Sequence, residues 1–162
     1  MEYRILTTPL GPMVALAGEG RLVRLDFADS PYALRVAGPE GTDPALREAE
    51  RWLDAYFAGE RPPVPADLSP AGTTFQKTVW GLLREIPWGA SRTYGELAAE
   101  LIRREGRSAS ARAVGQAVGR NPLSLMIPCH RVLGRNGALT GYAGGKERKR
   151  ALLRLEGITF TE

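Results

Sequence analysis

The pattern of hydrophobic and polar positions in the first part of the chain predicts a small antiparallel sheet. Three short segments rich in Val, Leu and Ile alternate apolar and polar side chains, as expected of strands with one covered face; they are residues 3–8, 13–17 and 21–27. Gly18-Glu19-Gly20 separates the last two segments and predicts a tight hairpin between them.

One helix follows the strands. Asp43 and Pro44 form an N-cap and first-turn pair, and apolar residues then recur at helical spacing until Gly59 ends the helix. Residues 60–72 contain four prolines and no periodic apolar pattern, which indicates an extended linker. We therefore expect a sheet-plus-helix domain over residues 1–59 and a second domain over residues 73–162.

The second domain has a mostly helical pattern. Thr73 with Gln76 forms a capping-box signature, and Pro87 ends the apolar stripe that follows. Thr93 with Glu96 forms a second capping box and opens another helix. Together with the sheet of the first domain, these helices predict an α+β fold.

A further short helix is predicted over residues 111–118, with Ser110 as its cap. Two short helices joined by a turn, the second carrying Arg112 and Gln116, resemble a helix-turn-helix whose second helix lies in a groove of DNA. Small residues such as Ala111 would allow close approach to a duplex. They also suit close packing between helices, so the pattern leaves both interpretations open.

Residues 121–132 hold the only cysteine and the only histidine of the chain, Cys129 and His130. A thiol is a soft nucleophile, and histidine is the side chain best suited to deprotonate it near neutral pH. The apolar run before the pair predicts a buried strand that delivers the nucleophile into a pocket. The alternative is an inert core cysteine beside a histidine in a surface loop, and the pair alone does not exclude it.

A glycine-rich loop and a basic helix end the chain. The glycines of residues 139–145 permit close approach to a ligand beside Cys129, or only a tight turn. Residues 146–155 predict a helix that closes before Gly157. Its basic residues are expected to face solvent; they are Arg148, Lys149 and Arg154.

The composition is that of an ordinary globular protein, with 43% hydrophobic and 25% charged residues among 162. A single cysteine excludes an intramolecular disulfide and fits a reducing compartment. One cysteine and one histidine cannot supply the ligands of a usual structural zinc site, so no metal is expected. The sequence shows neither a signal-peptide pattern nor a long apolar stretch, which predicts a soluble, cytoplasmic protein.

Charge is distributed unevenly along the chain. Residues 1–72 carry 7 Lys and Arg against 11 Asp and Glu, a net charge of −4, whereas residues 73–162 carry 15 against 7, a net charge of +8. A basic domain around a nucleophile favours a polyanionic partner such as nucleic acid. A solvated basic surface without a partner would carry the same charge, so charge alone does not decide the matter.

Five separated motifs lie in the second domain: Arg112-Ala113-Val114-Gly115, Asn121-Pro122, Ile127-Pro128-Cys129-His130-Arg131-Val132, Gly141-Tyr142-Ala143-Gly144-Gly145 and Leu155-Glu156-Gly157. Their identity and order resemble the O6-alkylguanine-DNA alkyltransferase family, and the resemblance extends over residues 73–160. It implies direct-reversal DNA repair, in which an alkyl group passes irreversibly from O6 of guanine to a cysteine. O4 of thymine is a further candidate alkyl donor.

The resemblance implies a role for each matching residue around the acceptor. Cys129 would attack the alkyl carbon, and His130 would act as the general base through a bridging water. Glu156 would orient His130, and Asn121 would brace the turn that holds the nucleophile. Tyr94 would rotate the 3′ phosphate of the target nucleotide and help to protonate the leaving guanine.

The resemblance also implies binding of double-stranded DNA in the minor groove, independent of sequence, by a monomer without a cofactor. Arg112 would enter the duplex in place of the extruded guanine, beside the helix residues Ala111, Gly115 and Gln116. The guanine pocket would be formed by Val132, Tyr142, Ala143 and Gly144. Many members carry serine where this chain has Ala143, so a hydroxyl contact to the guanine is lost there.

Three other functions compete with alkyl transfer. A lesion-binding protein of the alkyltransferase-like type replaces the cysteine, whereas this chain keeps Cys129. A cysteine hydrolase would use Cys129 and His130 as a dyad but leaves Arg112, Tyr94 and the basic domain unexplained. A helix-turn-helix transcription factor would need a reading helix richer in Asn, Gln and Arg.

Overall fold

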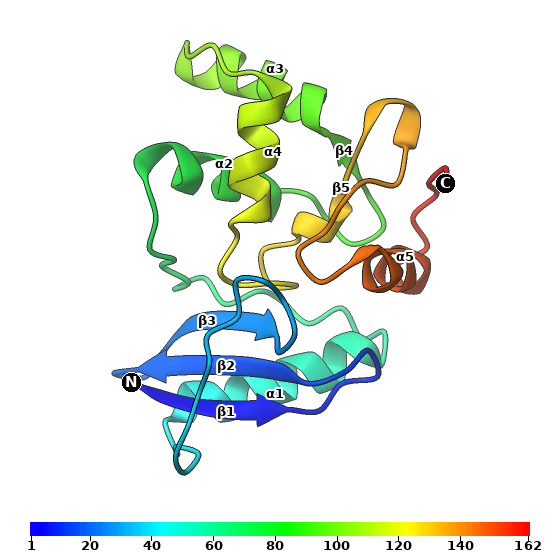
Figure 1. Ribbon diagram of the computed structural model, residues 1–162. Coiled ribbons are helices and arrows are strands. Elements are labelled where there is room, and N and C mark those ends of the chain that lie inside the picture. Colours follow the sequence, from blue (N-terminus) through cyan, green and yellow to red (C-terminus); the bar gives the residue numbers. More distant parts are fainter. The chain divides into compact units, whose positions relative to one another are not determined.

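The computed structural model describes all 162 residues and divides into two compact units (Figure 1). The first unit comprises Met1–Ala71 with Pro122–Met126, and the second comprises Gly72–Asn121 with Ile127–Glu162. The chain therefore returns to the first unit shortly before Cys129. None of the helices combines the length and the apolar content that crossing a bilayer requires.

Three strands and one helix form the first unit. Strands β1 (Glu2–Leu6), β2 (Met13–Gly18) and β3 (Arg21–Phe27) pair antiparallel in the order β1-β2-β3. Helix α1 (Pro44–Phe57) packs against all three strands (Figure 1). The small antiparallel sheet with one helix, predicted from the sequence, is confirmed.

The predicted hairpin joins β2 to β3. Glu19 and Gly20 both adopt positive φ, 55° and 76°, as a turn matched to the twist of antiparallel strands requires. β3 also receives a later part of the chain: Leu25 N donates to Pro122 O at 2.9 Å, and Ser124 N donates to Leu25 O at 2.9 Å. These bonds attach residues 122–124 to the sheet.

Local signals explain where α1 begins and ends. The Asp43 carboxylate accepts from Ala45 N at 2.9 Å, and Pro44 occupies the first turn. Gly59 follows the helix with φ 79°, a conformation that favours glycine. The inward face of α1 includes Leu46, which is fully buried and contributes about 2 kcal/mol through burial of its apolar surface.

The second unit is mostly helical, as predicted. Its helices are α2 (Thr74–Arg84), α3 (Tyr94–Glu105), α4 (Ala111–Gly119) and α5 (Lys146–Leu155). Both predicted capping boxes are present, at Thr73 and Thr93, and Ser110 caps α4 by accepting from Ala113 N at 3.0 Å. Trp80 is buried and donates to Ala117 O at 2.8 Å, which joins α2 to α4.

The two short strands of the second unit have no signal in the sequence. Strand β4 (Arg92–Thr93) pairs parallel with β5 (Val132–Leu133), and two turns of 3-10 helix are formed by Cys129–Arg131 (η1) and Arg135–Gly137 (η2). A two-residue strand shows no period, and its partner is distant in sequence, so only the tertiary structure reveals the pairing.

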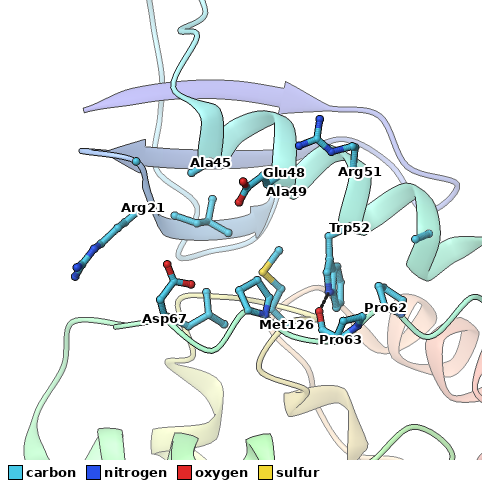
Figure 2. Close-up of a pocket in the computed structure, with 15 residues that line it drawn as sticks. Arg21, Ala45, Glu48, Ala49, Arg51, Trp52, Pro62, Pro63, Asp67 and Met126 are labelled. Carbon is cyan, nitrogen blue, oxygen red and sulfur yellow. Dashed lines mark hydrogen bonds between the residues drawn. The ribbon is translucent and has the colours of Figure 1, made fainter.

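A cavity of about 340 Å³ lies in the first unit, between α1, the β2–β3 hairpin and the proline-rich segment that follows α1 (Figure 2). Trp52 Nε1 donates to Pro63 O at 3.1 Å and holds that segment against the helix. Glu48 and Asp67 line the cavity together with Arg21, so its walls carry both signs of charge. The residues that line the cavity include no cysteine and none of the site residues predicted from the sequence.

Candidate active site

The segment that carries the thiol is buried throughout residues 121–130. It does not form the predicted buried strand. Cys129 begins the 3-10 turn η1, and Leu125 has φ 73°, a left-handed conformation that costs a residue with a side chain about 1 kcal/mol. The strand prediction was wrong because a run of apolar residues reports burial but not the direction of the backbone.

Asn121 spans the turn before the nucleophile. Its Nδ2 donates to Ile127 O at 2.7 Å, and Cys129 N donates to the same carbonyl at 2.8 Å. The Asn121 side chain is buried. The hydrogen bond from its amide group therefore closes the turn in a place where little water competes for it. The Asn121 side chain thus links the two ends of the segment that precedes the nucleophile.

His130, Arg131 and Glu156 form a buried polar network. His130 Nε2 lies 2.5 Å from Glu156 Oε2, and Arg131 Nε donates to Glu156 Oε1 at 2.6 Å. The side chains of His130 and Glu156 are both 0% exposed. Arg131 also donates from Nη1 to Ile86 O at 2.6 Å. Each carboxylate oxygen of Glu156 therefore serves a different partner.

This environment keeps the imidazole of His130 neutral. Burial lowers the pKa of His130 below its usual value, and the hydrogen bond with Glu156 opposes that shift. In the neutral ring, the proton on Nε2 is donated to Glu156, and Nδ1 is left as the basic nitrogen. His130 is thus suited to accept a proton while Glu156 fixes its tautomer.

A second network joins Tyr94, Thr140 and Lys149. The pairing of Thr93 with Leu133 places the start of α3 beside the chain that follows η1. The Tyr94 hydroxyl lies 3.1 Å from Thr140 Oγ1, and Lys149 Nζ donates to the same oxygen at 3.0 Å. The sequence singles out Tyr94 but not its two partners.

Lys149 is a buried cation that interacts electrostatically with the nucleophile. Its side chain is 0% exposed, so the prediction of a solvated Lys149 is wrong. Burial lowers the pKa of Lys149 to about 8; the negative charge of Cys129 opposes this shift and Lys146 adds to it. Because the interaction is mutual, a protonated Lys149 stabilises the Cys129 thiolate.

Helical spacing was the signal that could have revealed Lys149. Lys149, Leu152, Leu153 and Glu156 recur at i, i+3, i+4 and i+7, and all four are buried. Leu155, by contrast, is 37% exposed. Lysine is rarely buried in full, which is why its place on the inward stripe was not recognised from the sequence.

The predicted DNA-binding residues lie on the packed pair of helices α3 and α4 (Figure 1). Ala111, Arg112 and Gln116 are exposed on α4, and Arg112 forms no ion pair within the chain. Gly115 faces the ring of Tyr94: a Cβ at Gly115 would lie 3.6 Å from two ring carbons. Tyr94 therefore connects the α4 surface with the network that reaches Lys149.

The predicted guanine-pocket residues lie on either side of η2. Val132 is fully buried, whereas Tyr142, Ala143 and Gly144 are partly exposed. The glycine-rich loop turns sharply into α5, since Gly145 has φ 92° and its N–H donates to Tyr142 O at 2.9 Å. No group of three or more His, Cys, Asp or Glu side chains is arranged to hold a metal ion.

Two features define the class of protein. A buried thiol is followed by an imidazole paired with a carboxylate, which suits a nucleophile activated in a protected site. The same unit presents a pair of short helices with an exposed arginine. The combination is a thiol nucleophile carried on a helical unit that suits a polyanionic partner.

Comparison with known proteins gives this class a family. Residues 74–158 match the model described as 6-O-methylguanine DNA methyltransferase, DNA binding domain, and residues 1–69 match its ribonuclease-like domain. The methylated-DNA--protein-cysteine methyltransferase of Methanosarcina acetivorans is 44% identical over 97% of this chain and 99% of its own length. The constitutive enzyme of that name from Bacillus subtilis is 42% identical over 99% and 98% of the two chains.

A solved structure agrees over nearly the whole chain. The crystal structure of Mycobacterium tuberculosis OGT in complex with DNA superposes with a TM-score of 0.83 at 42% identity, covering 97% of this chain and 93% of that one. The chain therefore belongs to the 6-O-methylguanine DNA methyltransferase family. The family resemblance in the sequence and the α+β fold are both confirmed.

Proposed function

We propose that the protein repairs DNA by direct reversal, in which Cys129 removes an alkyl group from O6 of guanine and keeps it. The observation that carries the proposal is the buried Cys129 beside the His130–Glu156 pair, in the unit that matches the family's DNA binding domain. The relatives are named for transfer of a methyl group from DNA to a protein cysteine.

The chemistry is a single displacement at carbon. The Cys129 thiolate forms a bond to the alkyl carbon while the bond from that carbon to O6 breaks, and the electron pair stays on guanine. Neither a metal nor an organic cofactor is needed for this step. The product is a thioether, which has no acidic proton and no good leaving group. One protein therefore repairs one lesion.

Proton removal from the thiol is assigned to His130. Its basic Nδ1 takes the proton through a bridging water, while Glu156 holds the ring and stabilises the imidazolium. Asn121 braces the turn before the nucleophile through its bond to Ile127 O. A reduced thiol is required, so the proposal places the protein in the cytoplasm.

DNA binding is assigned to α4 and the start of α3. A buried thiol cannot reach a stacked base, so the target nucleotide must be turned out of the duplex. Arg112 fills the vacated stack, Tyr94 rotates the adjacent phosphate, and the small face of α4 approaches the minor groove. That face comprises Ala111, Gly115 and the polar Gln116. The minor groove carries a degenerate pattern, which suits repair at any sequence by a monomer.

The extruded guanine is assigned to a site formed by η1 and the glycine-rich loop. The carbonyls of Cys129 and Val132 accept from its exocyclic amine, and the loop Tyr142, Ala143, Gly144 closes over it. Ala143 offers only its backbone N–H to O6 of guanine. The absent hydroxyl changes the rate of transfer or the range of alkyl groups accepted, rather than the reaction. O4-methylthymine is a further candidate substrate.

Intact-mass measurement tests the proposed function. Incubation with duplex DNA containing O6-methylguanine should add one methyl group to each protein molecule, on Cys129, and the reaction should stop after one turnover. Cys129→Ser should bind the same duplex without a mass gain. DNA binding by the wild-type chain without methylation would instead indicate a lesion-binding protein, and multiple turnovers on a thioester would indicate a hydrolase.

Replacement of Arg112 tests the extrusion step. Arg112→Ala should slow repair in duplex DNA by about 10- to 100-fold, because unstacking the base costs a few kcal/mol that the inserted side chain offsets. Reaction with the free O6-alkylguanine base should be unchanged, since no stack is opened. Single-turnover rates on both substrates give the comparison.

Arg47→Ala is the matched control for that measurement. It removes one exposed positive charge from α1, in the other unit. Equal losses of Arg112→Ala on duplex and free base, or an equal effect of Arg47→Ala on the duplex, would contradict a role of Arg112 in extrusion.

A further inference from the structure

We propose that Thr140 is a positioning residue that relays a proton from Lys149 to Tyr94 as the guanine leaves. The inference deepens the proposed function and rests on it. Its basis is a continuous chain of hydrogen bonds from α5 to α3: Lys149 Nζ lies 3.0 Å from Thr140 Oγ1, which lies 3.1 Å from the Tyr94 hydroxyl.

The donors and acceptors along this chain fit transfer in one direction. An ammonium group only donates, so the Thr140 oxygen accepts from Lys149. The single hydroxyl proton of Thr140 is then available to the Tyr94 oxygen, and the Tyr94 proton is directed to a further acceptor. In the complex, that acceptor is the extruded guanine. Lys149 also approaches Gly141 O at 3.5 Å, so its head is held from two sides.

The Thr140 side chain is held by its surroundings. A Cβ on Gly134 would lie 2.7 Å from Thr140 Cγ2, which means that the methyl group packs directly on the Gly134 backbone. Gly134 N donates to Ala138 O at 2.8 Å, and Leu139 N donates to Thr161 O at 2.7 Å. With its methyl group and backbone both fixed, Thr140 keeps its hydroxyl aimed at Tyr94 and Lys149.

Atoms and charges balance along the relay. As the thiolate takes the alkyl group, the electron pair of the broken bond leaves guanine negatively charged. Tyr94 gives its proton to guanine, Thr140 gives its proton to the Tyr94 oxygen, and Lys149 gives one to Thr140. The thiolate and the ammonium are consumed together, leaving a thioether, an amine and a neutral guanine.

The acid strengths favour this direction. Burial lowers the pKa of Lys149 to about 8, whereas burial raises the pKa of Tyr94 above its usual value, with the bond to Thr140 opposing and the Cys129 charge adding to the rise. A Tyr94 phenolate therefore takes the proton of Lys149. Loss of the thiolate charge on alkylation makes Lys149 a stronger acid still.

The titratable groups around Lys149 come from three elements. They are Cys129 and His130 of η1, Tyr94 of α3 and Lys146 of α5 itself. No carboxylate forms an ion pair with Lys149. The only negative charge that acts on its ammonium in this set is the Cys129 thiolate, which the reaction removes.

The reaction of Cys129 with two different electrophiles distinguishes a proton relay through Thr140 from a purely structural role of this residue. Transfer from O6-methylguanine in duplex DNA requires a proton for the leaving base, whereas iodoacetamide releases iodide, which needs none. Single-turnover rates should be measured with both for the wild type, Thr140→Val and Thr140→Ser. Valine keeps the shape without the hydroxyl, and serine keeps the hydroxyl without the methyl group.

Thr140→Val should slow methyl transfer at least about 10-fold and leave alkylation by iodoacetamide unchanged, and Thr140→Ser should restore transfer. A wild-type transfer rate in Thr140→Val, equal losses with both electrophiles, or no rescue by serine would overturn the relay. A wild type that reacts with iodoacetamide but takes no methyl group from DNA would instead overturn the proposed function.

The wild-type pH profile gives a second readout if Thr140→Val does not fold. Methyl transfer should fall as pH rises past about 8, where Lys149 loses its proton, because the reaction would then leave a buried phenolate. Alkylation by iodoacetamide should reach a plateau instead. Profiles of the same shape for both electrophiles would overturn the relay.

Discussion

Replacement of Glu156 by glutamine should slow alkyl transfer to Cys129 by about 10² to 10⁴-fold. The amide keeps the size of the carboxylate, but it is neutral and cannot stabilise the imidazolium that forms as His130 takes the thiol proton. It can also present an N–H to His130 Nε2, which selects the tautomer with the proton on Nδ1. The nitrogen that should accept a proton is then occupied.

The same change should destabilise the fold. Glu156 is shared between His130 and Arg131, at 2.5 and 2.6 Å, and its side chain is fully buried. Removal of its charge leaves the Arg131 guanidinium, 11% exposed, without a carboxylate. Breaking a buried ion pair on one side costs about 3 kcal/mol. Urea unfolding and single-turnover rates should be measured on the same preparation.

Glu147→Gln is the control for Glu156→Gln. Glu147 lies on the same helix, is 89% exposed and pairs with Arg150 at the surface, so its replacement should change neither quantity measurably. An unchanged transfer rate in Glu156→Gln, or a loss of rate that matches a loss of DNA binding, would remove Glu156 from the proton pathway.

Much of the fold follows from local sequence, because its signals act over a few residues. The Asp43 cap and the capping boxes at Thr73 and Thr93 fix where helices begin, and each forms as expected. The Glu19–Gly20 turn fixes the hairpin in the same way. In each case the signal lies in the residues that form the cap or the turn, so no distant partner is needed.

The misses share a physical cause, which is dependence on distant partners. The β4–β5 pair joins Thr93 to Leu133, and no periodicity marks either strand. The turn at Leu125 follows a stretch bonded to the distant strand β3, where Leu25 N donates to Pro122 O and Ser124 N donates to Leu25 O. Apolar composition showed correctly that the Cys129 segment is buried, but it could not show the turn.

The residues of the candidate site also fall into those that the sequence indicates and those that only the structure reveals. The sequence pointed to Cys129 and His130 because they are unique in the chain, and the family motifs added Glu156. Thr140 carries no such signal, and the only sign of Lys149 is its spacing on the buried stripe of α5. A threonine in a loop and a lysine on a basic helix are ordinary, and their importance comes only from the bond between them and the burial of Lys149.

Lys149→Met should make the protein more stable and less reactive at the same time. Methionine fills a similar volume without charge. The rate of alkyl transfer should fall about 100-fold, the usual cost of removing one electrostatic stabiliser from a closed site. Unlike Thr140→Val, this variant should also react more slowly with iodoacetamide at neutral pH, because the Cys129 thiolate loses the stabilising positive charge of Lys149.

The stability gain follows from the lowered pKa of Lys149. Folding moves this pKa from 10.5 to about 8, so the folded chain binds fewer protons than the unfolded chain between these values. The cost of burying the ammonium is complete below pH 8 and disappears as pH rises towards 10.5. Methionine avoids that cost, which amounts to about 3 kcal/mol at pH 7.

Urea unfolding of wild type and Lys149→Met at pH 7 and pH 10 checks this prediction, with Lys146→Met as the control. Lys146 is exposed on the same helix, and its replacement should leave the free energy of unfolding almost unchanged. The wild type should gain stability relative to Lys149→Met as pH rises, which closes the gap between them. The prediction would be contradicted if Lys149→Met were less stable than the wild type at pH 7, or if the difference in their free energies of unfolding grew with pH. Either result would show that Lys149 stabilises the fold.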